Sequence, residues 1–431
     1  MSKANHISIR NHHLTIGGVD TVSLAQEYGT PLYVIDEKRI RENFRTFGSA
    51  FPDADIYFAA KANWNLSILR ILASEGAGAD VFSDGELYAA LLAGIPQEKI
   101  LFNGNSKTVY ELQMAIDSGV RVSVDSMDEL HTLSDLAIKA GKVVDIAFRV
   151  NPDVSPDTHP KIATGLASSK FGIGYKDVLN AYDEAKKLSG VNPVGIHCHI
   201  GSQITDVSPF GEAVERMMDI AEQITRLGIT LEFVDMGGGL GIPYQKEMAT
   251  PTPQDLADMI LPIFHRRSED LGISPRLVLE PGRYIVGDTS LLLAGVNTVK
   301  RSARNFVGVD AGLNLMIRPA MYDAYHEVAV ANKADSAGAE TYDIVGPICE
   351  SGDIIARGRK LPLIVPGDVM AVFDVGAYGF SMSSQYNGRC RCTEIMVSDG
   401  SVDVIREQEH YGDLIAKQKI PARLFVQFDT V

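Results

Sequence analysis

The sequence predicts an α/β protein built on an eight-stranded (β/α)8 barrel, followed by a C-terminal all-β domain. Eight short β-rich apolar runs, each followed by a helix-compatible segment, lie between residues 55 and 280. The first five runs begin 23, 22, 21 and 23 residues apart, about the length of one strand, one helix and two short loops. An open doubly wound sheet gives the same alternation. Eight near-regular units without an early G-x-G-x-x-G fingerprint favour the barrel.

The expected barrel elements follow from these runs and from the apolar periodicity between them. The strands are predicted at 55–62, 78–84, 100–105, 121–127, 144–152, 194–202, 231–240 and 276–280. Apolar residues three and four positions apart predict helices at 66–75, 85–93, 109–118 and 126–140. The longer connection at 151–193 is expected to carry an insertion.

The pattern changes after residue 286, where Pro and Gly punctuate short alternating runs typical of an all-β module. These runs cover 306–309, 341–345, 362–365, 369–373, 392–397 and 402–406. Similar runs occur at 7–9, 14–16 and 31–35, and we expect these N-terminal strands to pair with the C-terminal module. The predicted domains are a cofactor-binding barrel at 36–285 and a β-domain made of 1–35 and 286–431.

Composition narrows the class of protein. The 40 Lys and Arg against 55 Asp and Glu give a net charge of −15, which argues against a nucleic-acid partner. No run approaches the roughly 18 apolar residues of a transmembrane helix, and the first residues lack an apolar signal-peptide core. Four cysteines in 431 residues form no disulfide framework. We expect a soluble, cytoplasmic enzyme without a membrane partner.

Two charged residues close neighbouring strands of the predicted barrel, where such folds place their chemistry. Lys61 ends the first strand and Glu280 the eighth, so both are expected near one mouth. A strand-end lysine usually snorkels to solvent, and the pair could be a structural ion pair. Desolvation in a barrel mouth would instead lower the pKa of Lys61 and free its amine for imine chemistry.

Glycines follow the seventh and eighth strands. Gly237, Gly238 and Gly239 come after the seventh, and Gly282 precedes Arg283 after the eighth. Most glycine triplets only mark turns, but barrels commonly bind phosphate at these two loops. The position therefore favours a phosphate site.

The sixth strand ends with His197 and His199, which share one face of the strand with Cys198 opposite. A metal site is one interpretation, but further ligands are not evident nearby in the sequence, and we predict no metal. The alternative is an imidazole stacked on a flat cofactor, with Ser202 available to a phosphate oxygen. Together, an imine-forming lysine, a carboxylate, a glycine-lined phosphate site and a stacking histidine describe a pyridoxal 5'-phosphate site.

A series of longer motifs runs along nearly the whole chain. They are Y-F-A-A-K-A-N at 57–63, G-A-D-V-F-S-D-G-E-L at 78–87, F-N-G-N-S-K at 102–107, T-H-P-K-I-A-T-G at 158–165, S-K-F-G-I at 169–173, H-C-H-I-G-S-Q at 197–203, G-G-G-L-G, E-P-G-R, R-P-A-M-Y at 318–322, C-E-S-G-D at 349–353 and G-A-Y at 376–378. With these motifs in this order, the chain resembles the fold-type III pyridoxal phosphate-dependent decarboxylases, and among them the diaminopimelate decarboxylase family. The family fold is an alanine-racemase-like barrel with a C-terminal β-domain.

The resemblance implies roles for the residues that match its motifs. Lys61 would hold the cofactor covalently, Glu280 would keep the pyridine nitrogen protonated, and His199 would stack on the ring. The remaining cofactor contacts would come from Ser202, Gly238, Gly239, Gly282, Arg283 and Tyr378. Arg283, Arg318 and Tyr322, with Tyr378 beside them, would hold the far end of the substrate. A second subunit of a homodimer, which can pair into a tetramer, would supply Glu350 for the distal ammonium and Cys349 as proton donor.

The implied reaction is decarboxylation of meso-2,6-diaminopimelate to L-lysine, the last step of lysine biosynthesis. Arg318 and the motif at 158–165 favour this substrate, because ornithine and arginine have no distal carboxylate. The alternative is a related decarboxylase acting on another diamino acid, such as a carboxynorspermidine or siderophore-pathway substrate. An amino-acid racemase and a lone-barrel cofactor carrier fit less well with the segment 349–353 and the β-domain. A cofactor-free Schiff-base aldolase would be colourless when purified.

The sequence departs from the family at N-G-R-C-R-C, where Cys390 and Cys392 stand in place of the usual prolines. We expect two buried reduced cysteines on one strand face.

Overall fold

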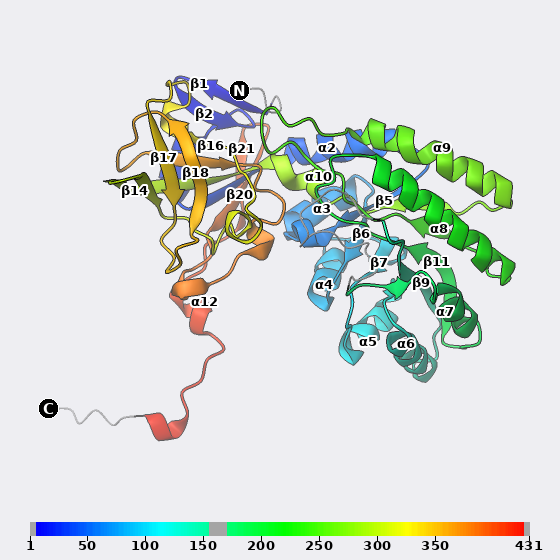
Figure 1. Ribbon diagram of the computed structural model, residues 1–431. Coiled ribbons are helices and arrows are strands. Elements are labelled where there is room, and N and C mark those ends of the chain that lie inside the picture. The colour runs from blue at the N-terminus through cyan, green and yellow to red at the C-terminus, as the bar shows by residue number, and fades with distance from the viewer. Residues whose placement is uncertain (1–5, 155–169, 426–431) are drawn as a thin grey trace.

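Eight parallel strands close into a barrel in the computed structural model, which describes residues 6–154 and 170–425 (Figure 1). The barrel strands are β5 (Asp55–Ala59), β6 (Gly78–Val81), β7 (Ile100–Phe102), β8 (Arg121–Val124), β9 (Val144–Asn151), β11 (Val191–His197), β12 (Phe233–Asp235) and β13 (Arg276–Leu279). Pairing of β13 with β5 and of β8 with β9 closes the ring. The predicted barrel and its eight strands are confirmed. The longer fifth connection adds the two-residue strand β10 (Ile173–Gly174), which pairs with β9.

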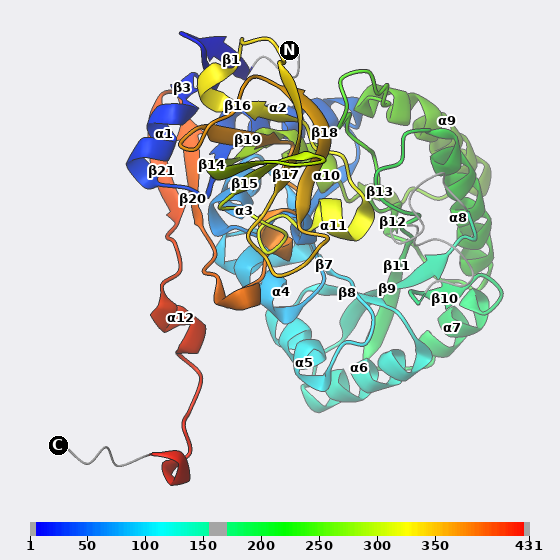
Figure 2. The same cartoon turned by 60° about the vertical axis from the view of Figure 1, so that its left-hand side comes forward.

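Helices surround this barrel, and Figure 2 shows several of them arranged around the strands. They are α2 (Glu37–Ala50), α3 (Leu66–Ser74), α4 (Asp84–Leu92), α5 (Val109–Ser118), α6 (Met127–Lys139), α7 (Val178–Ala185), α8 (Ser208–Arg226), α9 (Pro253–Leu271) and the short α10 (Arg283–Val286). Side-chain caps set several helix starts. Thr108 and Glu111 form a capping box at α5, and Ser126 caps α6. Because the eighth strand is followed only by α10, helix α2 packs between α3 and α9 and completes the ring.

Side chains alternate in direction along the barrel strands, which produces one apolar core between the strands and the helices and a second apolar cluster, the plug, inside the barrel. Residues such as Ile56, Phe58 and Ile146 belong to the large apolar cluster between strands and helices. The residues between them face the barrel axis. A separate cluster of six residues from six strands fills the interior: Tyr57, Leu101, Ala147, Val194, Phe233 and Val278. The barrel is therefore packed below its carboxyl-end mouth.

The remaining strands form a mixed sheet in the order β18-β17-β15-β14-β4-β20-β21. They are β4 (Leu32–Asp36), β14 (Ser290–Arg301), β15 (Asn305–Val309), β17 (Glu340–Val345), β18 (Ile354–Leu361), β20 (Thr393–Ser398) and β21 (Ser401–Arg406), with β16 (Val328–Val330) and β19 (Val369–Phe373) joined to β14. The N-terminal strand β4 lies between β14 and β20, which confirms its predicted pairing with the C-terminal part. Helix α11 (Arg318–Tyr322) interrupts this part of the chain.

Some predicted details of the β-rich part are wrong. The first strands β1 (Ile7–Arg10), β2 (His13–Ile16) and β3 (Val19–Asp20) hydrogen-bond only among themselves, and β2 packs against the mixed sheet through Leu14 and Ile16. Helix α1 (Thr21–Tyr28) follows them. The predicted strand at 362–365 is absent, and the strand is the preceding β18. Its Arg357, Gly358 and Arg359 sit at register shifts that hide the alternation.

The end of the chain departs from both parts. Helix α12 (Tyr411–Ile415) and the turn at Ala422–Leu424 extend away from the barrel and the mixed sheet (Figures 1 and 2). No helix within the described residues combines the length and the apolar character needed to cross a bilayer.

Candidate active site at the barrel mouth

A layer of polar side chains lies directly above the apolar plug of the barrel. The same alternation that turns the plug residues inward also turns inward the polar residues at the strand ends. They are Asp80, Asn103, Ser123, Arg149, His197, Asp235 and Glu280, and all of them are buried. A polar layer this deep must be internally paired, because burial of an unpaired polar group is costly.

Lys61 lies at the edge of this layer, in the turn Ala60–Ala62 that follows β5. Its Nζ forms an ion pair with Oδ2 of Asp80. Burial alone would lower the pKa of Lys61, but the charges of Asp80 and Glu280 outweigh it and raise that pKa above its ordinary value. The expectation of a lowered lysine pKa is therefore wrong, because Glu280 and Asp80, of which only Glu280 was expected near Lys61 from the sequence, stabilise its charge.

Glu280 is held by two neighbouring side chains. Asn103 Nδ2 donates to Glu280 Oε1 at 2.6 Å and to Asp80 Oδ1 at the same distance. His197 Nε2 lies 3.5 Å from Glu280 Oε2, and His197 Nδ1 is 2.9 Å from Ser123 Oγ. Burial by itself raises the pKa of Glu280, but the charge and hydrogen bond of His197 and the charge of Lys61 bring it below its usual range. Glu280 is therefore ionised.

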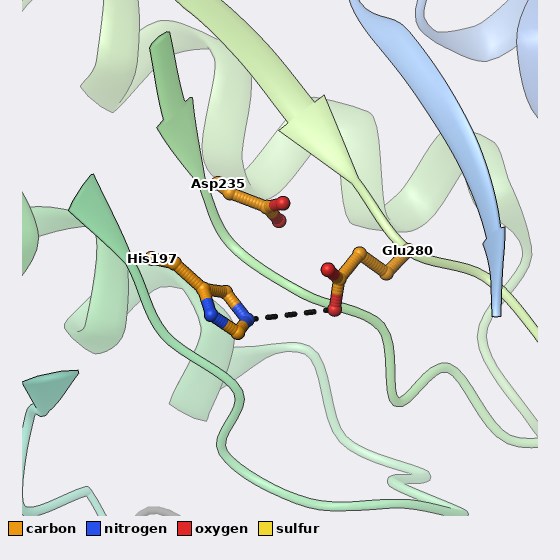
Figure 3. A group of neighbouring side chains, drawn as sticks. All are labelled: His197, Asp235 and Glu280. Carbon is orange, nitrogen blue, oxygen red and sulfur yellow. Dashed lines mark ion pairs between the residues drawn. The ribbon is translucent and has the colours of Figure 1, made fainter. Parts of the chain in front are cut away.

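His197, Asp235 and Glu280 form a compact group in Figure 3, with one ligand-type atom from each lying within 4.8 Å of the others. Further metal ligands beside His197 were not evident in the sequence, and the structure corrects this by placing Asp235 and Glu280 there. Such a trio has the composition of a metal site. The cationic Lys61 and Arg149 already act on Glu280, and the absence of a resident metal stays our prediction.

His199 lies beyond the strand, at the cavity. Its Nδ1 accepts the backbone N–H of Gly238 at 3.2 Å. Burial and the positive charges of Lys61 and Arg149 lower the pKa of His199 well below its ordinary value. A neutral, flat imidazole therefore faces the mouth.

The predicted glycine loops meet as a tight cradle. A Cβ on Gly238 would lie 2.1 Å from the carbonyl oxygen of Glu280, and one on Gly239 would lie 2.6 Å from that of Gly201. Gly282 precedes Arg283, whose guanidinium donates to Ser202 Oγ at 2.9 Å and to the Tyr244 hydroxyl at 2.6 Å. Closely packed glycine backbone, a hydroxyl and a guanidinium thus lie together at one small cavity, which suits an anion.

A cavity of about 720 Å³ opens beside Lys61. Among its lining residues are seven of those predicted from the sequence: Lys61, His199, Ser202, Arg283, Arg318, Tyr322 and Tyr378. The backbone N–H of Tyr378 donates to Ala62 O at 2.8 Å, which fixes this tyrosine next to the lysine turn. The structure therefore brings most of the predicted site together.

Three buried guanidinium groups surround this cavity, those of Arg149, Arg283 and Arg318. Within the part of the chain that is described, no carboxylate lies at ion-pair distance from any of the three. Arg318 Nε donates instead to His326 Nε2 at 3.3 Å, and its guanidinium stacks 4.9 Å from the Tyr244 ring. Such uncompensated cations favour an anionic ligand.

Four more predicted residues line a smaller cavity that also contacts Lys61 and His199: Gly238, Gly239, Glu280 and Gly282. Two predicted residues line neither cavity. Cys349 is exposed, and its N–H donates to Asn387 Oδ1 at 2.8 Å. Glu350 accepts from the Tyr386 hydroxyl at 2.6 Å and borders a separate hollow with Lys300. The predicted substrate motif at 158–165 lies outside the described residues.

The cysteines at 390 and 392 also differ from expectation. Both precede β20 rather than sharing a strand face, and only Cys392 is fully buried.

Several site residues were missed in the sequence. Asp80, Asn103 and Arg149 belong to the polar layer, and Glu86 and Tyr244 line the cavity. The signal was available, since Asp80 in G-A-D-V and Arg149 in F-R-V-N are charges inside otherwise buried strands. Both occupy positions whose side chains face the barrel axis, which marks them as site residues.

Comparisons with known proteins identify the family of this chain. Residues 37–287 match the family model described as pyridoxal-dependent decarboxylase, pyridoxal binding domain. A diaminopimelate decarboxylase from Archaeoglobus fulgidus is 59% identical over 408 residues, which cover 95% of this chain and 97% of that protein. A crystal structure of diaminopimelate decarboxylase from M. jannaschii in complex with L-lysine has 43% identity and a TM-score of 0.93, and the match covers 98% of this chain and 99% of that one.

Proposed function

The chain belongs to the pyridoxal phosphate-dependent decarboxylases, in their diaminopimelate decarboxylase family, and from this we propose that it converts meso-2,6-diaminopimelate to L-lysine and carbon dioxide. This reaction is the last step of lysine biosynthesis. The observation that carries the proposal is that Lys61 and the buried Arg318 line the same cavity. Among the described residues, no carboxylate lies at ion-pair distance from Arg318. A diamino acid with a second carboxylate needs a cation in the same cavity as the amine that reacts.

The residues present fit pyridoxal phosphate. The backbone at Gly238 and Gly239 packs too closely on neighbouring backbone to admit a side chain, and both glycines line a small cavity together with Lys61. Ser202 and Arg283 add a hydroxyl and a charge at the same spot, and Tyr378 lies against Arg283. When bound, the cofactor supplies the electron sink that lets a bond to a carboxylate break.

Lys61 is the covalent anchor of the cofactor in this proposal. Its protonated amine must lose a proton before it can bond to carbon. Oδ2 of Asp80 is paired with its Nζ, and burial together with the Glu280 charge raises the pKa of Asp80. Asp80 is therefore the group best placed to take that proton.

Other residues position the reacting groups. The ionised Glu280 would pair with the pyridine nitrogen of the cofactor, and the neutral His199 ring would stack on the cofactor. Gly238, Gly239, Gly282, Arg283 and Ser202 hold the phosphate, while Arg283, Arg318, Tyr322 and Tyr378 hold the substrate.

We propose that a second subunit completes the site. Cys349 and Glu350 lie outside this chain's own cavity, which supports their delivery to a partner's mouth. There the Cys349 thiol protonates the carbon that has lost its carboxylate, and Glu350 pairs with the distal ammonium. The working unit is a homodimer, which can pair into a tetramer, in the cytoplasm.

We also propose a division of the chain into a barrel at 36–285 and a β-domain of 1–35 and 286–431. Separate apolar clusters in the two parts support it, with Leu292 and Val372 in one and Ile146 and Phe148 in the other.

The test is an assay of the purified protein. We expect cofactor absorbance in the near-visible range and release of lysine from meso-diaminopimelate. Lys61→Ala should lose both the covalent cofactor and nearly all turnover while keeping its fold. Activity only on carboxynorspermidine or another diamino acid would contradict the substrate.

Covalent cofactor retained in Lys61→Ala would assign the anchor to another lysine. Lys107 is poorly suited, because its Nζ is buried and donates to Gly104 O, Ser123 O and Glu129 Oε1. Lys170, beside the Phe171 ring, is the other lysine to check by peptide mapping.

A further inference from the structure

The proposed function uses Glu280 but not the residues behind it. Glu280, His197 and Ser123 form a chain from β13 through β11 to β8, with exposed fractions of 3%, 1% and 1%. Ser123 Oγ contacts His197 Nδ1 at 2.9 Å, which leaves Nε2 directed at Glu280 Oε2, 3.5 Å away (Figure 3). Water has little access to this chain, so the ring has few alternatives to this orientation.

The position of His197 decides which buried carboxyl group is charged. Glu280 and Asp235 lie close together, and burial disfavours two adjacent anions. Burial and the charge of Glu280 raise the pKa of Asp235 well above its ordinary value, whereas His197 and Lys61 lower that of Glu280 despite its burial. The proton therefore stays on Asp235, and the negative charge stays on the carboxylate that faces the mouth.

We propose that His197 is a positioning residue, whose Nε2–H, braced by Ser123, fixes the orientation and the negative charge of Glu280. The inference rests on the proposed pairing of Glu280 with the pyridine nitrogen. Asn103 Nδ2 donates to the other oxygen of Glu280, Oε1, at 2.6 Å, so each carboxylate oxygen has a neighbouring nitrogen. The other titratable groups acting on Glu280 or its neighbours are Lys61, Asp80, Arg149, Cys198, His199 and Asp235.

The test compares cofactor-loaded variants of the full chain. His197→Leu keeps a similar volume but removes the donor, and His197→Gln keeps an N–H. We expect His197→Leu to lower kcat per bound cofactor about 10- to 100-fold, the range typical when a supporting residue is removed, with a smaller change in KM. The pH at which the cofactor absorbance changes should fall, because a weaker anion stabilises a protonated nitrogen less. His197→Gln should restore most of both properties.

Cys198→Ala is the matched control, since Cys198 is equally buried on the opposite face of the same segment. It should leave the spectral pH profile and kcat unchanged. Wild-type kcat and spectrum in His197→Leu, or no recovery in His197→Gln, would overturn the inference. If His197→Leu does not fold, Ser123→Ala should show the same shift to a smaller extent, and an unshifted profile would overturn the inference equally.

Glu280→Gln separates this inference from the proposed function. Lost turnover in Glu280→Gln with an unaffected His197→Leu contradicts the role of His197 alone. Wild-type turnover in Glu280→Gln contradicts the role of Glu280 and of His197 together.

Discussion

Arg318 shows how one side chain can select the substrate. It begins α11, is 5% exposed, and holds its charge beside the Tyr244 ring without a carboxylate partner in the described chain. Burial lowers its pKa from the ordinary arginine value, because the buried charge has lost much of its hydration. An anionic ligand would compensate for this desolvation cost. A distal carboxylate is such a ligand.

Replacing this arginine should therefore affect the substrate more than the cofactor. We expect Arg318→Ala to lower kcat/KM for meso-diaminopimelate about 10- to 100-fold, which corresponds to a lost charge-assisted hydrogen bond of about 1.5–3 kcal/mol. The kcat/KM of Arg318→Lys should lie between those of the wild type and Arg318→Ala, because lysine keeps the positive charge but not the planar, two-pronged guanidinium. Steady-state kinetics with cofactor content measured in parallel give the answer. Unchanged kinetics in Arg318→Ala would place the distal carboxylate elsewhere.

Glu86 makes the free energy of unfolding depend on pH. Burial raises its pKa to about 7, and its Oε2 accepts the backbone N–H of Phe82 at 2.7 Å. The folded state thus holds the proton more tightly than the unfolded chain. The stabilising protonated form is fully present below the unfolded pKa, near pH 4.5, and its contribution is lost as pH rises through about 7.

Glu86→Gln keeps an acceptor and cannot ionise. We expect its unfolding free energy to rise relative to wild type by about 2 kcal/mol between pH 5 and pH 8, which follows from 1.36 kcal/mol per pKa unit. Denaturant titrations at the two pH values measure this difference. Glu98→Gln, on the exposed turn Gln97–Lys99, is the control and should show no such trend. Equal behaviour of both variants would contradict the prediction.

At the scale of elements, every second side chain of a barrel strand faces the barrel axis, and this alternation places the polar residues at the mouth. In β12, Phe233 fills the interior plug and Asp235, two residues later, enters the polar layer. The loop after β12 then turns so tightly that only glycine fits at Gly238. Strand and loop together set the distance between the layer and the cradle.

A methyl group in this loop should therefore disturb cofactor binding. We expect Gly238→Ala to bind pyridoxal phosphate weakly, because the added Cβ would lie 2.1 Å from the backbone oxygen of Glu280. Gly48→Ala in α2 is the matched control. A Cβ there meets nothing within 4 Å, and helix propensity favours alanine by up to about 1 kcal/mol. Cofactor titration and thermal unfolding of both variants test this, and normal cofactor affinity in Gly238→Ala would refute a close-fitting cradle.

At the scale of the whole molecule, the separation of Lys61 from Cys349 requires an explanation. Lys61 lies in the barrel mouth, whereas Cys349 lies on the surface of the β-rich part, held by Asn387. The proposed homodimer explains the separation, because a second chain would then complete the site with its own Cys349.

Mixing two inactive variants tests this arrangement. Neither Lys61→Ala nor Cys349→Ala forms a complete site alone, but a mixed dimer has one site with both groups intact. Random exchange gives half mixed dimers with one working site of two, so activity should recover to about a quarter of wild type at most. Lysine release after subunit exchange measures it. No recovery, with exchange verified independently, would place Cys349 and Lys61 in the same subunit's site.

The sequence by itself determined the barrel, most of its strand positions and part of the mouth, including Lys61, His199 and Glu280. These depend on local periodicity, on strand-end position and on motifs, all of which are readable without contacts. It failed at β18, where Gly358 and flanking charges break the alternation. It also failed at β1 to β3, whose sheet partners are set by packing rather than by pattern.

Only the tertiary structure decided which charges meet. Asn103 joins Asp80 and Glu280, which are 23 and 177 residues away from it along the chain. These two carboxylates reverse the expected pKa shift of Lys61. Tertiary packing also brings His197 to Glu280 and leaves Arg318 without a carboxylate among the described residues. Electrostatic interactions depend on distances of a few ångströms between segments remote in sequence. Ring closure of the barrel sets these distances, and no local pattern contains them.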